Sequence, residues 1–290
     1  MKLKFLFMLM LLLPMSSMAQ KVAYAVLKDG TLTFYYGNDK PQGAYDVEKM
    51  VKDKYNLDAK EWNQVSEQIK TIVFDQSFKE YRPKSCKCWF DGCQKLISII
   101  GIKENLNTSE VTNMRWMFSA CENLTSLDVS GFKTDNVTNM SYMFYGCENL
   151  TSLDVSGFKT DNVTDMYGMF YGCKNLTSLD VSGFKTDNVT DMGWMFSGCE
   201  NLTSLDVSNF NTNNVNDMGS MFRYCENLKT IYVGAGWNTS NVQHSDFMFA
   251  DSPNLVGGQG TKYDPSHTDA SYAHIDGGSD NPGYFTKKTE

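Results

Sequence analysis

The chain has 290 residues, which is enough for one or two domains, and its apolar content of 41% and charged content of 21% are those of a folded protein. Its formal net charge is −8. This acidic balance argues against nucleic acid as a partner and against docking on anionic lipid, because both need basic residues gathered on one face.

Residues 1–19 have the three parts of a secretory signal peptide. Lys2 and Lys4 form a basic start, the run FLFMLMLLLPM is apolar but too short to cross a bilayer, and small residues ending at Ala19 suit cleavage before Gln20. No Cys lies close behind to carry a lipid, and no later run of about 18 apolar residues occurs. The sequence therefore predicts an exported chain without a membrane span, located outside the cell, at its surface or in the periplasm.

Residues 20–84 are predicted to form a small β-rich N-terminal element. The stretch AYAVLKDGTLTFYYGND at 23–39 contains two β-rich runs joined by Asp29 and Gly30, a pair typical of hairpin turns. The stretch at 47–65 is ambiguous between helix and loop. IKTIVFD at 69–75 is predicted to be a strand that can also serve as the first rung of the repeats that come after it.

A repeat of 26 residues dominates the rest of the chain. Three residue types recur at this step: Met114, Met140, Met166, Met192 and Met218; Val111, Val137, Val163, Val189 and Val215; and Cys121, Cys147, Cys173, Cys199 and Cys225. Degenerate copies at 89–99 (WFDGCQKLISI) and 248–258 (MFADSPNLVGG) flank them, as expected of capping repeats, which need a polar outer face.

The first half of each copy has the apolar spacing of a helix. In the copy that contains Met140, apolar residues lie at i, i+3, i+4, i+7 and i+10, which predicts a short helix with one buried face. Thr138 would be its N-cap, and in later copies Asp165 and Asp191 would lie at the helix N-terminus. The residues on the buried face are Met140, Met143, Phe144, Cys147 and Leu150.

The second half of each copy, LTSLDVS, predicts a short strand. Leu153 and Val155 alternate with Asp154, so the two apolar side chains would point inward and the carboxylate outward. The turn GFKTDN comes next, with Phe158 expected to be buried beneath it.

Such a unit cannot bury its apolar face alone, so roughly seven units would stack, strand on strand and helix on helix. The predicted fold is therefore an α/β repeat, a leucine-rich-repeat-like solenoid with one short strand and one short helix per 26-residue unit. The predicted organisation is a signal peptide at 1–19, the N-terminal element at 20–84, the solenoid at 85–256, and a C-terminal cap and tail at 257–290.

The pattern VTxMxxMFxxCxNLTSLDVSxFxT resembles the repeats of the BspA-like leucine-rich-repeat surface proteins of bacteria, and the resemblance covers about 85–255. It implies an exported protein that binds host or partner-cell proteins. It transfers no catalytic motif.

The residues themselves offer no catalytic constellation. His267 and His274 lie among Asp264, Asp269 and Asp276 in the tail, but their spacing matches no defensible metal motif, and the segment is interpreted as a polar cap. His244 is the remaining histidine. No catalytic, cofactor-binding or metal-binding residue is predicted, and the chain is predicted not to be an enzyme.

The eight cysteines of an exported chain would ordinarily suggest disulfides. Five of them, however, occupy one slot of successive copies on the apolar stripe, where Cys acts as a small buried hydrophobe. We expect these to be free thiols. The state of Cys86 and Cys88, which lie outside this series, is left open.

Two faces are candidates for binding. The first consists of aromatic residues that vary between copies and that suit protein or glycan ligands, although rings of adjacent copies packing on one another is an equal alternative. Its residues are Trp116, Tyr142, Tyr145, Tyr167, Tyr171, Trp194 and Tyr224.

The alternative face is an acidic column on the predicted strands. Neighbouring carboxylates would repel, and lysines five residues later and flanking serines are expected to offset this. A solvated column is one interpretation, and a site for a cation or basic partner is the other. The residues are Asp128, Asp154, Asp180 and Asp206, with Lys133, Lys159 and Lys185, and Ser126, Ser152, Ser178 and Ser204.

These features together predict an exported binding or adhesion protein for an extracellular protein or glycan. A structural spacer that presents another module is the first alternative, and an enzyme with its site in the N-terminal element or tail is the second. The sequence leaves the oligomeric state open.

Overall fold

The computed structural model describes residues 20–53 and 56–289. The predicted signal peptide at 1–19 lies outside the described residues. Within the described residues, no helix has the length and apolar character needed to cross a membrane.

The N-terminal element is built on a five-stranded sheet with the order β3-β1-β2-β6-β7. β1 (Val22–Lys28) and β2 (Thr31–Gly37) pair antiparallel around Asp29 and Gly30, both at positive φ, which confirms the predicted hairpin. β3 (Tyr45–Asp46) pairs with β1, and β6 (Thr71–Phe74) pairs parallel with β2. The predicted strand at 69–75 is thereby confirmed.

The ambiguous stretch at 47–65 forms a second, two-stranded hairpin followed by a helical turn. β4 (Met50–Lys52) pairs antiparallel with β5 (Asp58–Lys60), and the 3₁₀ helix η1 (Glu61–Gln68) follows. Two further short helices are η2 (Gln76–Glu80) and α1 (Ile102–Asn105). Trp62 of η1 packs edge-on against Phe34 of β2, which joins this stretch to the core of the sheet.

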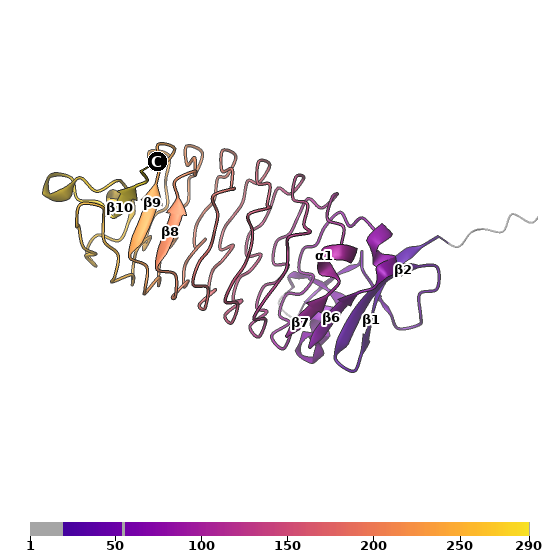
Figure 1. Cartoon of the computed structure of the whole chain (residues 1–290). Coiled ribbons are helices and arrows are strands. Elements are labelled where there is room, and N and C mark those ends of the chain that lie inside the picture. Colours follow the sequence, from indigo (N-terminus) through magenta and orange to yellow (C-terminus); the bar gives the residue numbers. More distant parts are fainter. Residues whose placement is uncertain (1–19, 54–55, 290) are drawn as a thin grey trace, which may run out of the picture.

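The N-terminal sheet continues directly into the repeats. β7 (Ser98–Ile100) forms at the end of the degenerate copy at 89–99 and pairs parallel with β6. Strand β6 is therefore the first rung of the stack, and the sheet extends beyond the predicted boundary at residue 84. Figure 1 shows the later coils of chain lying side by side, from the indigo N-terminal sheet to the yellow C-terminal end.

Each 26-residue copy forms one coil, and successive coils are joined by single parallel β-bridges. These bridges link Asn113 to Asn139, Asn139 to Asp165, Asp165 to Asp191, and Asp191 to Asp217. Inside the coils, one Phe per copy stacks nearly parallel on the next at 5.7–5.8 Å between ring centroids. The stack is Phe118, Phe144, Phe170, Phe196, Phe222 and Phe249.

The predicted helix in each copy is wrong, and with it the predicted leucine-rich-repeat-like solenoid: the fold is β-rich, and the only α-helix among the described residues is α1. Two residues per copy, for example Tyr142 and Gly146, have left-handed backbones, which an α-helix does not tolerate. The N–H groups of Met140 and Phe144 donate to carbonyls of the next coil, at Asp165 and Met169, both at 3.0 Å.

The apolar spacing was misleading for a definite reason. Between the bonds to the next coil, Met143 donates to Met140 and Cys147 donates to Phe144, so the chain advances in tight four-residue turns. Such turns place the same side chains inward as a helix would. The expected N-cap Thr138 instead donates its hydroxyl to the carbonyl of Thr112 in the preceding coil.

The predicted strand forms only at the two ends of the described stack, as β7 in the degenerate first copy and as two further strands near the C-terminal end. β8 (Ser204–Val207) and β9 (Thr230–Val233) pair parallel, and β10 (Phe285–Lys287) adds to β9. In the copies between these ends, the LTSLDVS segment is not a strand. The predicted uniform stack of strands is therefore wrong in these copies. In the turns that follow the segment, the rings of Phe132 and Phe158 stack at 6.4 Å between centroids. Phe158 is buried as predicted.

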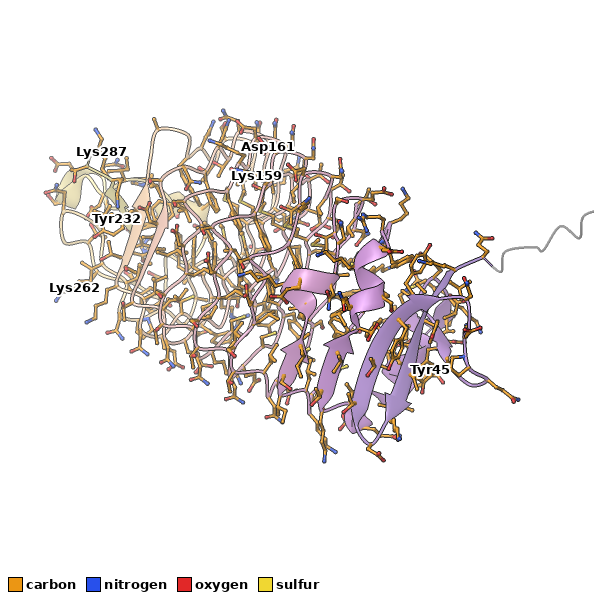
Figure 2. All side chains as sticks on the ribbon, turned by 45° about the vertical axis from the view of Figure 1, so that its right-hand side comes forward. Tyr45, Lys159, Asp161, Tyr232, Lys262 and Lys287 are labelled. Carbon is orange, nitrogen blue, oxygen red and sulfur yellow. The ribbon has the colours of Figure 1, made fainter. Side chains whose placement is uncertain are left out.

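Buried threonines also tie the coils together, a feature that the sequence pattern did not predict. The hydroxyl of Thr134 donates to the carbonyl of Lys159 at 2.9 Å and accepts from the N–H of the same residue at 2.7 Å. Thr160 repeats both bonds with Lys185. Figure 2 labels Lys159 with Asp161 at one edge of the stack, where the turn GFKTDN exposes both side chains.

The C-terminal segment closes the end of the stack. Phe285 of β10 packs against Phe249 and Trp237 of the last coil. Asp276 has an exposed fraction of 4% and accepts from Thr261 and from the N–H of Gln259. The 3₁₀ helices η3 (Ala270–Tyr272) and η4 (Gly278–Asp280) lie in the same segment.

Candidate functional site

The seven predicted aromatic residues, here called the aromatic face, lie on neighbouring coils. Six of them are half-buried, and Tyr224 is 39% exposed. The rings of the six half-buried residues contact one another in series across the coils, as the packing alternative expects, and they also keep part of their surface exposed. The centroid distances are 6.0 Å for Trp116–Tyr142, 5.1 Å for Tyr142–Tyr167, 5.0 Å for Tyr145–Tyr171 and 5.1 Å for Tyr171–Trp194.

Glycines in the following coil make room for these rings. A Cβ on Gly168 would lie 2.8 Å from the ring of Tyr142, and a Cβ on Gly193 would lie 2.9 Å from the ring of Tyr167. Real Cβ atoms do not approach other atoms this closely, so a larger residue at either position would push the ring away. Gly168 and Gly193 therefore leave space for the rings of the preceding coil.

Arginines cover the aromatic face at both ends. The guanidinium of Arg115 lies 4.1 Å from the ring centroid of Trp116, and that of Arg223 lies 4.4 Å from Tyr224. Arg223 is also 5.0 Å from the ring of Phe247, which is 56% exposed. Phe247 was not predicted from the sequence because its copy is degenerate. This copy starts one residue later than the step of 26 requires and has Ser245 in the slot of Met218.

A polar hollow of about 310 Å³ lies at the edge of the aromatic face, beside Tyr142 and Tyr167, whose rings contact each other. Asp165 accepts from the N–H of Tyr167 at 3.0 Å and from the Asn139 side chain at 2.7 Å. The lining of the hollow is Arg115, Ser141, Tyr142, Asp165, Tyr167 and Asp191.

The carboxylates beside this hollow form a second acidic series, at the residues of the β-bridges. Asp191 accepts from the N–H of Gly193 at 3.0 Å. Burial raises the pKa of Asp191 to about 6, and the nearby charges of Asp217 and Asp165 act in the same direction. The predicted helix N-termini at Asp165 and Asp191 are wrong, since both residues lie in tight turns at the contact between coils.

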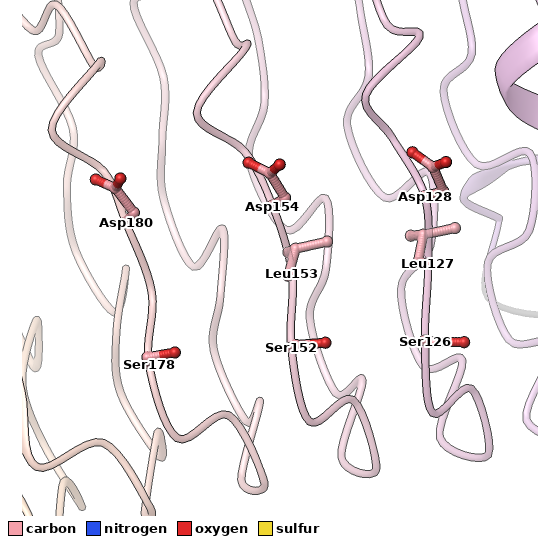
Figure 3. Close-up of a pocket in the computed structure, with 8 residues that line it drawn as sticks. All are labelled: Ser126, Leu127, Asp128, Ser152, Leu153, Asp154, Ser178 and Asp180. Atoms are coloured by element: carbon pink, nitrogen blue, oxygen red, sulfur yellow. The ribbon is translucent and has the colours of Figure 1, made fainter.

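The acidic column of the alternative face is present and ionised. Figure 3 shows Asp128, Asp154 and Asp180 on successive coils, with their side chains on the same side of the chain. They line an open hollow of about 480 Å³. Hydrogen bonds from Ser130 and Ser156 lower the pKa values of Asp128 and Asp154 below the ordinary range. These carboxylates are therefore charged at neutral pH.

The groups that stabilise the column differ from those predicted. The donors are the serines two residues after each Asp, and not Ser126, Ser152, Ser178 and Ser204. Ion pairs form at the two ends of the column, where Lys103 lies 3.4 Å from Asp128 and Lys288 lies 2.8 Å from Asp206. In the described part of the chain, no ion pair joins the column to Lys133, Lys159 or Lys185.

All eight cysteines are buried free thiols, including Cys86 and Cys88. In the tail, His267 lies 3.4 Å from Asp264, and His274 contacts the carbonyl of Ile275. Over residues 20–53 and 56–289 no group of three or more His, Cys, Asp or Glu side chains has an arrangement that could hold a metal ion.

The comparisons with known proteins concern the repeats. The family model described as "Mycoplasma protein of unknown function, DUF285" matches residues 84–180 and 147–259, which together span more than half of the chain. No curated protein and no solved structure matches the chain. The chain therefore belongs to the DUF285 family.

Proposed function

We propose that this protein is an exported repeat protein of the BspA-like kind, and that its aromatic face binds an extracellular protein or glycan. The signal-peptide pattern at 1–19 supports export. The repeat motif and membership of the DUF285 family are consistent with a BspA-type repeat protein.

The observation that carries the proposal is the continuity of the aromatic face. Ring contacts run from Trp116 to Trp194 over adjacent coils, and Arg115 and Arg223 extend the surface at its ends. Trp, Tyr and Arg are the residues that most often anchor binding interfaces, because each combines a large apolar area with a polar group.

Variation between copies distinguishes this face from the acidic column. The column presents Asp in four successive copies, whereas the ring positions hold Trp, Tyr, Gly and Ser in different copies. Repeated like charge increases association rate and salt sensitivity more than specificity. The patterned surface of the aromatic face is better suited to one particular partner.

Two matched variants of the mature chain test the proposal. One changes Trp116, Tyr142, Tyr167 and Trp194 to Ser, and the other changes the four Asp residues of the column to Asn. Ser is accommodated at these ring positions in other copies, since Ser220 and Ser141 occupy them naturally. We expect the Ser variant, once shown to be folded, to lose binding to extracellular-matrix proteins or to an array of glycans.

The Asn variant should keep that binding. Loss of binding in the Asn variant with retention in the Ser variant would assign the site to the acidic column. Absence of any ligand for the unchanged chain would favour a structural spacer.

A further inference from the structure

We propose that the acidic column is an electrostatic switch for strand pairing. Repulsion between neighbouring carboxylates keeps the LTSLDVS segments of the middle coils apart, and neutralisation of the column lets these segments pair as parallel strands that extend the sheet of β8. The segments are 126–129, 152–155 and 178–181. The switch is a conformational change of the stack and does not depend on the ligand of the aromatic face.

One heptapeptide adopts two conformations in this chain. LTSLDVS occurs at 124–130, 150–156, 176–182 and 202–208, and it forms a strand only in the last copy, as β8. Figure 1 draws β8 and β9 as arrows and the coils before them without arrows. Because the four copies have the same residues, intrinsic strand propensity does not explain the difference. The neighbouring coil decides whether the segment pairs.

The two sides of β8 show which property of the neighbour matters. On one side Asp206 is in register with Tyr232 of β9, and Lys288 lies 2.8 Å from Asp206 and 5.0 Å from the ring centroid of Tyr232. On the other side the residue in the equivalent slot is Asp180, and β8 forms no strand pair with that coil. β8 therefore pairs where its carboxylate meets a ring and a lysine, and not where it meets a second carboxylate.

The contact between β6 and β7 agrees with this rule, since the strands pair with the uncharged Val73 opposite Ile100. The contact between β7 and segment 126–129 is unpaired as well, but α1 interrupts the repeat there and the switch does not include it.

The backbone of the middle segments has unused hydrogen-bonding capacity. Within the described chain, the N–H groups of Leu153, Asp154 and Val155 donate to no carbonyl of a neighbouring coil. The apolar side chains beneath are also less covered, since Leu179 is 9% exposed and Leu205 of β8 is 1% exposed. Pairing would satisfy these backbone groups and bury the leucines.

Only a small movement is needed for the segments to pair. The N–H of Thr151 reaches the carbonyl of Thr125 at 3.4 Å, whereas the equivalent bond beside β8 and β9, from Lys229 to Thr203, measures 3.0 Å. On the opposite side of the coils, β-bridges run without interruption from Ser85–Asn113 to Asp217–His244 and hold the stack together. The coils can therefore approach one another on the LTSLDVS side while the bridged side stays in place.

The charges that face the column leave its centre uncompensated. Lys103 lies 3.4 Å from Asp128 at one end, and Lys288 neutralises Asp206 at the other. Asp154 and Asp180, between them, receive hydrogen bonds from Ser156 and Ser182 but form no ion pair in the part of the chain that the structure describes. Like charges directly opposite each other on adjacent strands oppose pairing.

Acid is the condition that closes the switch. Hydrogen bonds from Ser156 and Ser182 lower the pKa values of Asp154 and Asp180, against the charges of the neighbouring column carboxylates. Pairing brings the carboxylates closer, which raises their pKa relative to the unpaired form, so pairing is favoured as the pH falls and is lost as the pH rises. The unpaired form is thus the neutral-pH form, and the paired form is expected below the ordinary Asp pKa of about 4.

The first test removes the charge without acid. The column variant changes Asp128, Asp154 and Asp180 to Asn, which keeps an oxygen to accept the serine bonds. The matched control changes Asp135, Asp161 and Asp187 of the exposed turns to Asn, the residue found at the equivalent position Asn213. Hydrogen exchange at neutral pH is measured by mass spectrometry on peptides 150–156 and 176–182, relative to the unfolded chain of the same variant.

We expect exchange in both peptides to slow by about tenfold or more in the column variant and to stay unchanged in the control. Infrared absorption should show a gain of sheet in the unchanged chain between neutral pH and about pH 3, and none in the column variant, which is already paired. Unchanged exchange in the column variant, or equal slowing in the control, overturns the switch.

The converse test opens an existing pair and decides the question even if the column variant does not fold. Tyr232→Asp with Lys288→Gln places a second carboxylate beside Asp206 and removes its cation. Tyr232→Asn with Lys288→Gln is the uncharged match. Exchange at 204–207 should be about tenfold or more faster in the Asp variant than in the Asn variant. Equal rates in the two variants would show that charge does not control pairing.

Discussion

The hydroxyl of Ser252 donates a 2.7 Å hydrogen bond to the carbonyl of Phe222. One coil earlier, the thiol of Cys225 makes the equivalent bond to the carbonyl of Phe196 at 3.1 Å. Ser252 therefore keeps the bond of the Cys that it replaces. The recurring cysteines are donors to interior carbonyls as well as small apolar side chains.

Replacing Ser252 by Ala should destabilise the C-terminal coils by about 2–3 kcal/mol. The change removes the donor to Phe222 and also the acceptor of the Cys225 N–H, and buried groups left unpaired cost about 1–3 kcal/mol each. Ser252→Cys, which restores the residue of the other copies, is the matched control and should cost less than about 1 kcal/mol. Urea denaturation measures the stability of the two variants, and native-state hydrogen exchange at residues 222–225 measures the local effect. Equal losses of stability in the two variants would contradict the role of the hydrogen bonds.

The thiols should be unreactive in the folded protein and all eight should be present after unfolding. Burial raises the pKa values of Cys147 and Cys225 to about 12, so almost no thiolate, the reactive form, exists at neutral pH. Titration with a thiol reagent before and after addition of guanidinium checks this. A count below eight in the unfolded chain would show that disulfides form.

Phe170→Ala should cost about 3–5 kcal/mol, because the ring is fully buried between Phe144 and Phe196 and its loss leaves a cavity. Tyr171→Ala should cost about 1 kcal/mol, since this half-buried ring packs on the neighbouring rings of the aromatic face and not in the core. Thermal and denaturant unfolding compare the two variants. Equal losses would show that the inward and outward assignments are wrong.

Asp191→Asn should raise the melting temperature above pH 6 and have little effect near pH 4. The pKa of Asp191 is raised to about 6 in the folded protein, above that of an unfolded Asp, so the folded state binds the proton more tightly. Its contribution to stability is complete at low pH and is lost as the pH rises through about 6. Asn113 and Asn139 occupy equivalent positions, which makes Asn an acceptable replacement.

The control for this prediction is Asp154→Asn. Hydrogen bonds from Ser156 lower the pKa of Asp154, so its contribution has the opposite sign and is lost as the pH falls. Melting curves between about pH 4 and pH 8 that show the same trend for both variants would contradict the assignment of Asp191.

The sequence by itself determined the features that depend on the residues of a single turn or on the 26-residue repeat. The step of 26 residues located the coils, and the apolar residues it aligned, such as Met140 and Phe144, are buried. Asp29 and Gly30 predicted the hairpin because few residue pairs adopt its left-handed backbone. The aromatic face was found because its positions vary while the core positions do not.

The tertiary structure alone decided how the backbone of each copy is bonded. The N–H of Met140 finds its acceptor at Asp165, 25 residues away in the next coil, and no local pattern distinguishes this from a bond within a helix. Tyr142 likewise contacts the ring of Tyr167, which lies in the next coil. Gly168, the residue after Tyr167, leaves space for the Tyr142 ring. Contacts between copies fix the conformation within a copy, because the hydrogen bonds that replace the helix exist only when the coils are stacked.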